Sequence, residues 1–261
     1  CLNRRDPLLH RILNENIHVD LHQTGLSFDA LFDIISSLPS YKRARVPIRF
    51  GHLTDWKYEE KEMSDLYSMI PEDFACVMLT RFPLSSFQRN IFTGQKNLLL
   101  HISLTPLIKR YERDFVDPAE VIASASGIPT EQVLFMLRPL VKGHQKAVIE
   151  LLDLLPSGTN VALRGMSTDN IPGIADLNKI PGDEISEVNA YAKERNLQMW
   201  DFFGCVLRKN LNIPFFKFLE ARNLPNSACH ACSNEPICRN ASEGFVPEML
   251  EDELQELQIP F

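Results

Sequence analysis

The strongest constraint on the fold is a repeated alternation between short apolar runs and amphipathic stretches of helical periodicity. Short apolar runs are typical of buried strands, and amphipathic stretches between them are typical of helices that cover a sheet. This alternation predicts an α/β protein with a largely parallel sheet, because two parallel strands need a crossover between them. The predicted strands cover residues 17–21, 46–50, 75–80, 98–104, 132–137 and 160–163.

Capping residues mark the predicted helices between these strands. Ser27 precedes an amphipathic stretch at 27–35, and Asp117 precedes a helix at 118–125 that has Pro118 in its first position. Serine and aspartate accept hydrogen bonds from the first free N–H groups of a helix, and proline has no N–H to leave unpaired there. Two further helices are predicted at 61–69 and 143–155.

The pattern changes at about Asp183, where helical stretches follow one another without intervening strands. They cover 184–194, 199–209 and 215–222, and a cysteine-containing loop and an acidic tail follow. We therefore predict two parts, an α/β domain at 1–182 and a small helical C-terminal element at 183–261. The chain starts with Cys1 instead of methionine, so we expect the N-terminal domain to be incomplete as it stands.

Composition excludes several classes of protein. A chain of 261 residues can bury a core without disulfides. The net charge of −7 disfavours a general duplex-binding surface, which needs clustered lysine and arginine, so we expect no nucleic-acid partner. No apolar run approaches the roughly 20 residues that span a bilayer, so we expect no membrane partner.

Three of the six cysteines form a C-x2-C-x5-C array that is too tight for an ordinary disulfide framework. The array consists of Cys229, Cys232 and Cys238. Thiolates at this spacing can converge on one Zn²⁺ or one iron–sulfur cluster, either of which usually takes four protein ligands. Cys205 is the nearest candidate for the fourth ligand, and His230 and Ser242 are weaker ones. Chance clustering or a redox-sensitive loop is the alternative.

Cys76 differs from these, because its apolar surroundings predict a buried thiol.

Polar residues recur where the predicted strands end. Thr54 and Asp55 follow the strand at 46–50, Arg81 follows the next strand, Ser103 lies near the end of 98–104, and Arg138 follows 132–137. Ligands of parallel α/β proteins bind at the carboxyl ends of strands. Each residue alone is typical of a turn. Together they predict a site for one ligand that carries hydroxyls and a carboxylate.

These segments resemble the radical S-adenosylmethionine enzymes, specifically their spore photoproduct lyase-like branch. The sequences G-H-L-T-D at 51–55, L-T-R at 79–81, H-I-S-L at 101–104 and L-R-P-L at 137–140 occur in the order of that branch's motifs. Those motifs are a TD turn, a T-K-S strand end, an S-x-S-L strand and a P-I/L strand end. The resemblance covers roughly residues 1–165 and implies a partial (β/α)6 barrel.

The resemblance also implies the cofactors and the residues that bind them. The family's cluster loop is C-x3-C-x2-C, and Cys1 matches its third cysteine, so the first two ligands of the [4Fe–4S] cluster would lie upstream. Thr54 and Asp55 would approach the methionyl end of S-adenosylmethionine. Three further residues match cofactor-binding positions. Arg81 would bind the cofactor carboxylate, at a position where the family has lysine. Ser103 would lie beside the ribose, and Arg138 would lie on the next strand.

Two departures from the family bear on the reaction. His52 lies near the position of the lyases' hydrogen-donating cysteine, so it is a candidate catalytic residue and the lyase reaction itself is not expected. The C-terminal array resembles part of the SPASM or Twitch cysteine pattern, although its usual next cysteine is Ser242 here. This likeness implies an auxiliary [4Fe–4S] cluster, with zinc as the alternative. Its expected ligands are Cys205, Cys229, Cys232 and Cys238.

We therefore expect a cytoplasmic radical S-adenosylmethionine enzyme. It would generate a 5′-deoxyadenosyl radical that abstracts hydrogen from a peptide or small molecule, with electrons from a donor such as flavodoxin or ferredoxin. One alternative is an iron–sulfur-containing RecB-type nuclease, which places a similar array near its C-terminus, although no E-x-K signature lies on a predicted strand. The other is a zinc-stabilised interaction module without catalysis.

Overall fold

The computed structural model describes residues 27–39, 48–50, 67, 70–72, 74–106, 116–165, 182–200, 206, 252–253 and 256–257. The chain divides into two compact units. We call residues 48–68 and 75–212 the sheet unit, and residues 1–47, 69–74 and 213–261 the terminal unit.

In the part of the chain that the structure describes, the sheet unit is built on six parallel strands whose order in the sheet is their order in the chain. The strands are β1 (Ile48–Phe50), β2 (Cys76–Thr80), β3 (Leu98–Leu104), β4 (Val133–Leu140), β5 (Asn160–Gly165) and β6 (Gln198–Trp200). The prediction of an α/β protein with a parallel sheet is therefore confirmed. The sheet is open, since β1 and β6 form its two edges.

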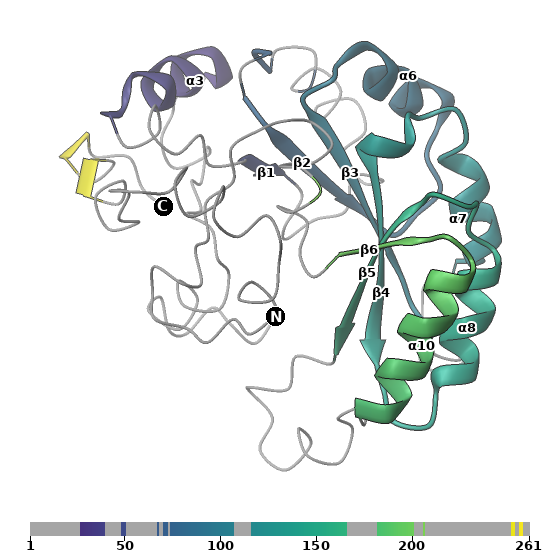
Figure 1. Ribbon diagram of the computed structural model, residues 1–261. Helices are drawn as coiled ribbons and strands as arrows, with labels where there is room; N and C mark the ends of the chain where they lie inside the picture. Colours follow the sequence, from purple (N-terminus) through teal and green to yellow (C-terminus); the bar gives the residue numbers. More distant parts are fainter. Residues whose placement is uncertain are drawn as a thin grey trace. The chain divides into compact units, whose positions relative to one another are not determined.

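The described helices of the sheet unit lie on the same side of the strands (Figure 1). They are α6 (Ser86–Gly94), α7 (Pro118–Ser124), α8 (Gln145–Asp153) and α10 (Gly182–Glu194). Crossovers between parallel strands are almost always right-handed, so a sheet that grows in one direction places each crossover helix on the same face. No helix among the described residues is long and apolar enough to cross a bilayer.

Most predicted strands agree with the structure to within a few residues. The strand at 98–104 is β3, and β2 begins one residue later than predicted. Gln132 is not part of β4, because it ends the 3₁₀ turn η4 (Thr130–Gln132) and its side-chain amide donates to the carbonyl oxygens of Gln95 and Leu98. The predicted strand at 17–21 and most of the predicted helix at 61–69 lie outside the described residues.

The strand β6 corrects the expectation of helices without strands after Asp183. Gln198, Met199 and Trp200 pair in parallel with β5, so the predicted helix at 199–209 does not begin at Met199. Three residues are too few to carry a recognisable alternation of apolar and polar side chains, which is why the strand was missed. Both α10 and β6 belong to the sheet unit.

The predicted helix caps are present. The hydroxyl of Ser27 accepts from the backbone N–H of Ala30 at the start of α3 (Phe28–Ser37), at 3.3 Å. The carboxylate of Asp117 accepts from the N–H of Ala119 at 3.0 Å, and Pro118 occupies the first turn of α7. The fourth predicted helix begins at Gln145 instead of 143, because Gly143 adopts a turn with φ of +76°.

Strand alternation and register sort the strand residues onto two faces. One face is apolar at nearly every described position, and it holds the helices. Its buried residues include Met78, Leu98, Leu100, Ile102, Val133, Phe135 and Val161. Burying each such side chain contributes about 1.5–3 kcal/mol, so this layer contributes strongly to the unit's stability.

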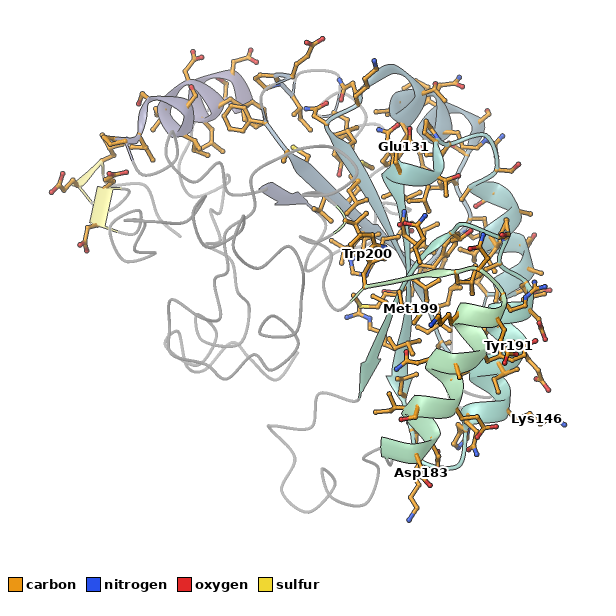
Figure 2. The ribbon with its side chains drawn as sticks, in the orientation of Figure 1. Glu131, Lys146, Asp183, Tyr191, Met199 and Trp200 are labelled. Atoms are coloured by element: carbon orange, nitrogen blue, oxygen red, sulfur yellow. The ribbon has the colours of Figure 1, made fainter. Side chains whose placement is uncertain are left out.

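The opposite face carries several polar residues among buried apolar ones such as Leu99, Leu134 and Met136, and we call it the polar face. Its members include His101, Ser103, Arg138, Asn160 and Trp200. Figure 2 shows the two sides of β6, where Met199 lies towards α10 and Trp200 lies towards the polar face.

The terminal unit has apolar contacts of its own. The rings of Phe32 on α3 and Phe74 meet edge to face, with their centroids 5.0 Å apart. Both side chains are buried, as are Leu31 and Leu38. An edge-to-face pair of this kind adds about 0.5–1.5 kcal/mol beyond the area that it buries.

Candidate functional site

Two of the predicted ligand-binding residues meet at the carboxyl end of the sheet. The Nε of Arg138 on β4 donates a hydrogen bond to the Oγ of Ser103 on β3, at 3.1 Å. Ser103 is half-buried and Arg138 is exposed, so the pair joins the interior of the polar face to solvent. Ser103 is level with Met136 in the strand register, which places Arg138 one pleat nearer the carboxyl edge.

An irregularity in β4 accompanies the position of Arg138. The pairing of β4 with β5 shifts register between Leu137 and Leu140. Pro139 lies inside this interval, and proline has no N–H to donate to a neighbouring strand. Irregularities of this kind commonly lie beside functional sites, because they redirect a side chain that a regular strand would aim elsewhere.

Arg81 leaves the sheet at the same edge. It follows Thr80, the last residue of β2, which is level with Ile102 in the strand register. Its guanidinium carbon lies 5.2 Å from the centre of the Phe82 ring, which is a cation–π contact. The turn is fixed by a hydrogen bond from the N–H of Phe82 to the hydroxyl of Thr80, at 3.0 Å.

This edge of the sheet suits an anionic ligand with hydroxyl groups. The Ser103 oxygen accepts from Arg138, and its own O–H can donate to a ligand. Arginine offers five N–H donors in a planar fork. Carboxylates and phosphates are the groups that such a fork binds best.

The other predicted site residues lie outside the described residues. They are Cys1, His52, Thr54, Asp55, Cys205, Cys229, Cys232 and Cys238. The two cluster hypotheses and the zinc alternative therefore stay predictions. Among the residues that the structure does describe, no group of three or more histidine, cysteine or acidic side chains could hold a metal ion.

Cys76 is the cysteine that the structure describes, and it agrees with the prediction of a buried thiol. It is fully buried in β2 and forms no disulfide. Burial disfavours the thiolate, so it raises the pKa of Cys76 well above its ordinary value. At neutral pH the side chain is a protonated, apolar part of the core.

Sequence reasoning missed two polar side chains on the polar face. His101 is 1% exposed and lies two residues before Ser103, level with Leu79 and Leu134. The sequence did contain a signal for His101, since the alternation along 98–104 puts residues 101 and 103 on one face. Asn160, also 1% exposed, begins β5 and could be recognised only once that strand's partners were known.

Asn160 connects three strands through its side chain. Its Nδ2 donates to the carbonyl oxygens of Thr130 and Val133, at 2.8 and 3.1 Å, and its Oδ1 accepts from the indole N–H of Trp200, at 2.8 Å. These bonds tie the start of β4 to β5 and to the indole on β6. A buried amide with this many partners holds its own orientation and that of the ring it contacts.

Comparisons with protein-family models, with curated proteins and with solved structures give no match. The residues at the carboxyl edge and the order of the strands are therefore the features that bear on function.

Proposed function

We propose that the protein is a radical S-adenosylmethionine enzyme that binds its cofactor at the carboxyl edge of the sheet. The observation that carries the proposal is the hydrogen bond between Arg138 and Ser103. These residues are 35 positions apart in sequence, and both match positions that the family resemblance assigns to the cofactor. Because the two side chains are in contact, they support one shared ligand site better than they support two unrelated turn residues.

The strand order supports a partial (β/α)6 barrel as the architecture. Six parallel strands follow one another in chain order, and the described helices of the sheet unit lie on one side. A doubly wound sheet reverses its strand order and places helices on both faces. A barrel-like sheet instead keeps one direction and turns its helix-free face inwards, where a cofactor can bind.

The described residues fit the chemistry of S-adenosylmethionine. Arg138 and Arg81 can bind the carboxylate, and the hydroxyl of Ser103 can bind the ribose. When bound beside a [4Fe–4S] cluster, the cofactor supplies a 5′-deoxyadenosyl radical for hydrogen abstraction. Cys1 would be one ligand of that cluster, and His52 would face the substrate.

The remaining parts of the proposal follow from the same assignment. A peptide or small molecule would be the substrate, and a flavodoxin or ferredoxin would supply electrons in a reducing cytoplasm. The four C-terminal candidates, Cys205, Cys229, Cys232 and Cys238, would hold an auxiliary [4Fe–4S] cluster.

The cluster is tested by anaerobic reconstitution of the natural full-length protein, followed by iron and sulfide counting and EPR. We expect a reduced [4Fe–4S] signal whose spectrum changes when S-adenosylmethionine is added. Cys205→Ala should lose the auxiliary cluster and keep the other. A protein that binds zinc alone, or a cluster whose spectrum ignores the cofactor, would contradict the proposal.

The binding site is tested by calorimetric titration of S-adenosylmethionine into the reconstituted protein. Arg138→Ala should raise the Kd by about tenfold or more, since it removes a charge-assisted hydrogen bond, and Ser103→Ala should raise it by about fivefold. Matched controls are Ser126→Ala, in the turn after α7, and Arg195→Ala, after α10. Both controls precede strands, so they lie at the amino edge. Equal losses in variants and controls would refute a site at the carboxyl edge.

A further inference from the structure

The sheet pairing around Arg138 is interrupted, so the position of its backbone depends on what holds the end of β4. Leu137 is level with Leu163 on β5. The next pair, Leu140 with Gly165, lies three residues further along β4 but two residues further along β5, so β4 carries one extra residue in this interval. Leu140 and Gly165 are the last residues of their strands. Chain ends of this kind open more readily than the middle of a sheet.

A glycine turn at 141–144 follows β4 directly. The N–H of His144 donates to the carbonyl oxygen of Val141 at 3.1 Å, and Gly143 has a φ of +76°. A left-handed residue in the third position is typical of a type II turn, and glycine adopts it without strain. The N–H of Gly143 donates in turn to Oε2 of Glu184, at 3.0 Å. This hydrogen bond ties the turn to the first turn of α10.

Glu184 belongs to a helix that is itself anchored. Val188 and Ala192 of α10 are fully buried. The hydroxyl of Tyr191 donates to Asp153, the last residue of α8, so the two helices are joined where they end. Both helices begin at the carboxyl edge of the sheet (Figure 1). The carboxylate of Glu184 is therefore an acceptor on a fixed element, and it restrains the turn that follows β4.

We propose that Glu184 is a positioning residue for Arg138. By holding the turn, its carboxylate keeps the last pair of β4 and β5 closed, and with it the backbone from which Arg138 reaches Ser103. The guanidinium then meets a ligand already oriented, so less conformational freedom is lost on binding. The effect on cofactor affinity rests on the proposed function, whereas the orientation of the guanidinium does not.

The orientation is measured without a ligand, by NMR of the ¹⁵N-labelled natural full-length protein. The Nε–H of Arg138 is the donor to Ser103, and Arg138→Lys identifies its resonance by removing it. In Glu184→Ala this N–H should exchange with water about fivefold faster, because its hydrogen bond opens more often. Glu184→Gln keeps an acceptor oxygen and should restore the parent rate. Glu187→Ala removes an exposed acid about one turn further along α10 and should leave the rate unchanged.

Calorimetric titration of S-adenosylmethionine into the reconstituted protein gives the second measurement. Glu184→Ala should raise the Kd by about fivefold. Removing a negative charge near the carboxylate of a ligand would by itself tighten binding, so the direction of the change separates the hydrogen bond from the charge. In an Arg138→Ala background, Glu184→Ala should change the Kd by less than about twofold, because no guanidinium remains to be positioned.

Gly143 allows a variant at the other end of the hydrogen bond, and Gly158 supplies its matched control. Their φ angles are +76° and +81°, and both have open space where a Cβ would lie. Alanine strains the backbone at both positions, so urea denaturation should show a similar loss of stability. Gly158 precedes β5 and lies at the amino edge. Gly143→Ala should speed exchange at Arg138 and raise the Kd, and Gly158→Ala should do neither.

The two measurements separate this proposal from the proposed function. Unchanged exchange at Arg138 in folded Glu184→Ala and Gly143→Ala overturns the positioning role, and the cofactor site stands if the parent binds S-adenosylmethionine. A loss of affinity that persists in full in the Arg138→Ala background also overturns it, since Glu184 would then act elsewhere. If the parent does not bind S-adenosylmethionine but exchange changes as expected, the proposed function falls and the positioning role stands.

Discussion

At the scale of single residues, Ser103 and Arg138 could be singled out from the sequence as candidate ligand contacts, whereas the bond between Trp200 and Asn160 could not. Ser103 and Arg138 lie at the ends of strands whose apolar runs are long enough to be recognised in the sequence, and both residue types can bind a polar ligand. Trp200 lies on a three-residue strand with no readable alternation, and its bond to Asn160 spans 40 residues. A contact of that kind is set by strand order, which a single sequence does not encode locally.

Cys76 gives a prediction about reactivity. The thiolate is the form that reacts with alkylating agents, and burial raises the pKa of this thiol, so Cys76 should resist iodoacetamide in the native protein. In urea it should react fully. Peptide mapping by mass spectrometry distinguishes Cys76 from the other five cysteines. Labelling of Cys76 in the folded protein at the unfolded-state rate would show that β2 is not buried.

The same thiol predicts a loss of stability in alkali. Its pKa in the folded state lies above its ordinary value of 9.0, so the folded state holds the proton more tightly than the unfolded state. The contribution is therefore fully present below pH 9 and declines as the pH rises beyond it. In Cys76→Ala this component of the alkaline decline should disappear, and urea titrations at several pH values would measure it.

At the scale of elements, helix starts were the most predictable features. Ser27 and Asp117 were predicted as caps from residue type alone, and both make the expected hydrogen bond. The capping box of α6 is similarly local, since Ser85 and Gln88 bond to each other's backbone N–H groups. The β4 irregularity was not predicted, because it depends on how β4 pairs with β5.

The cap of α7 gives a stability prediction. Asp117→Ala removes the acceptor for the N–H of Ala119 and should lower the free energy of unfolding by about 1 kcal/mol. Asp117→Asn keeps an oxygen in the same place and should recover most of that loss. Both are measured by urea denaturation. If Asp117→Asn is as unstable as Asp117→Ala, the side chain is not acting as a cap.

The contact between α8 and α10 predicts a shifted tyrosine. Tyr191 donates its hydroxyl proton to Asp153 at 2.5 Å, and this hydrogen bond is the main reason why the pKa of Tyr191 is raised. Because the folded-state pKa is the higher one, the stabilising contribution is present at neutral pH and is lost as the pH rises above the ordinary value of 10.0.

Absorbance titration of tyrosinate measures this shift. Subtracting the Tyr191→Phe curve from that of the parent isolates Tyr191 among the five tyrosines. In Asp153→Asn the isolated titration should move back towards the ordinary pKa, because the carboxylate no longer accepts the proton. An unchanged midpoint in Asp153→Asn would show that the hydrogen bond is not the cause.

At the scale of the whole molecule, the alternation of strands and helices predicted the class of fold and five of the six strands that the structure describes. The first five observed strands overlap predicted ones, since each is a run of apolar residues long enough to read. The sixth was expected to be helical. Periodicity could not predict the order of the strands in the sheet. A sheet in chain order and a sheet whose strand order reverses contain the same apolar runs.

The chain-order sheet has a consequence for how the protein is made. Each strand from β2 to β6 pairs with the strand synthesised just before it, so no strand has to wait for a distant partner. The sheet can therefore grow at its newest edge while the ribosome is still extending the chain, and β6 is added last. We expect nascent chains that end after β4 to protect β2 and β3 from proteolysis already.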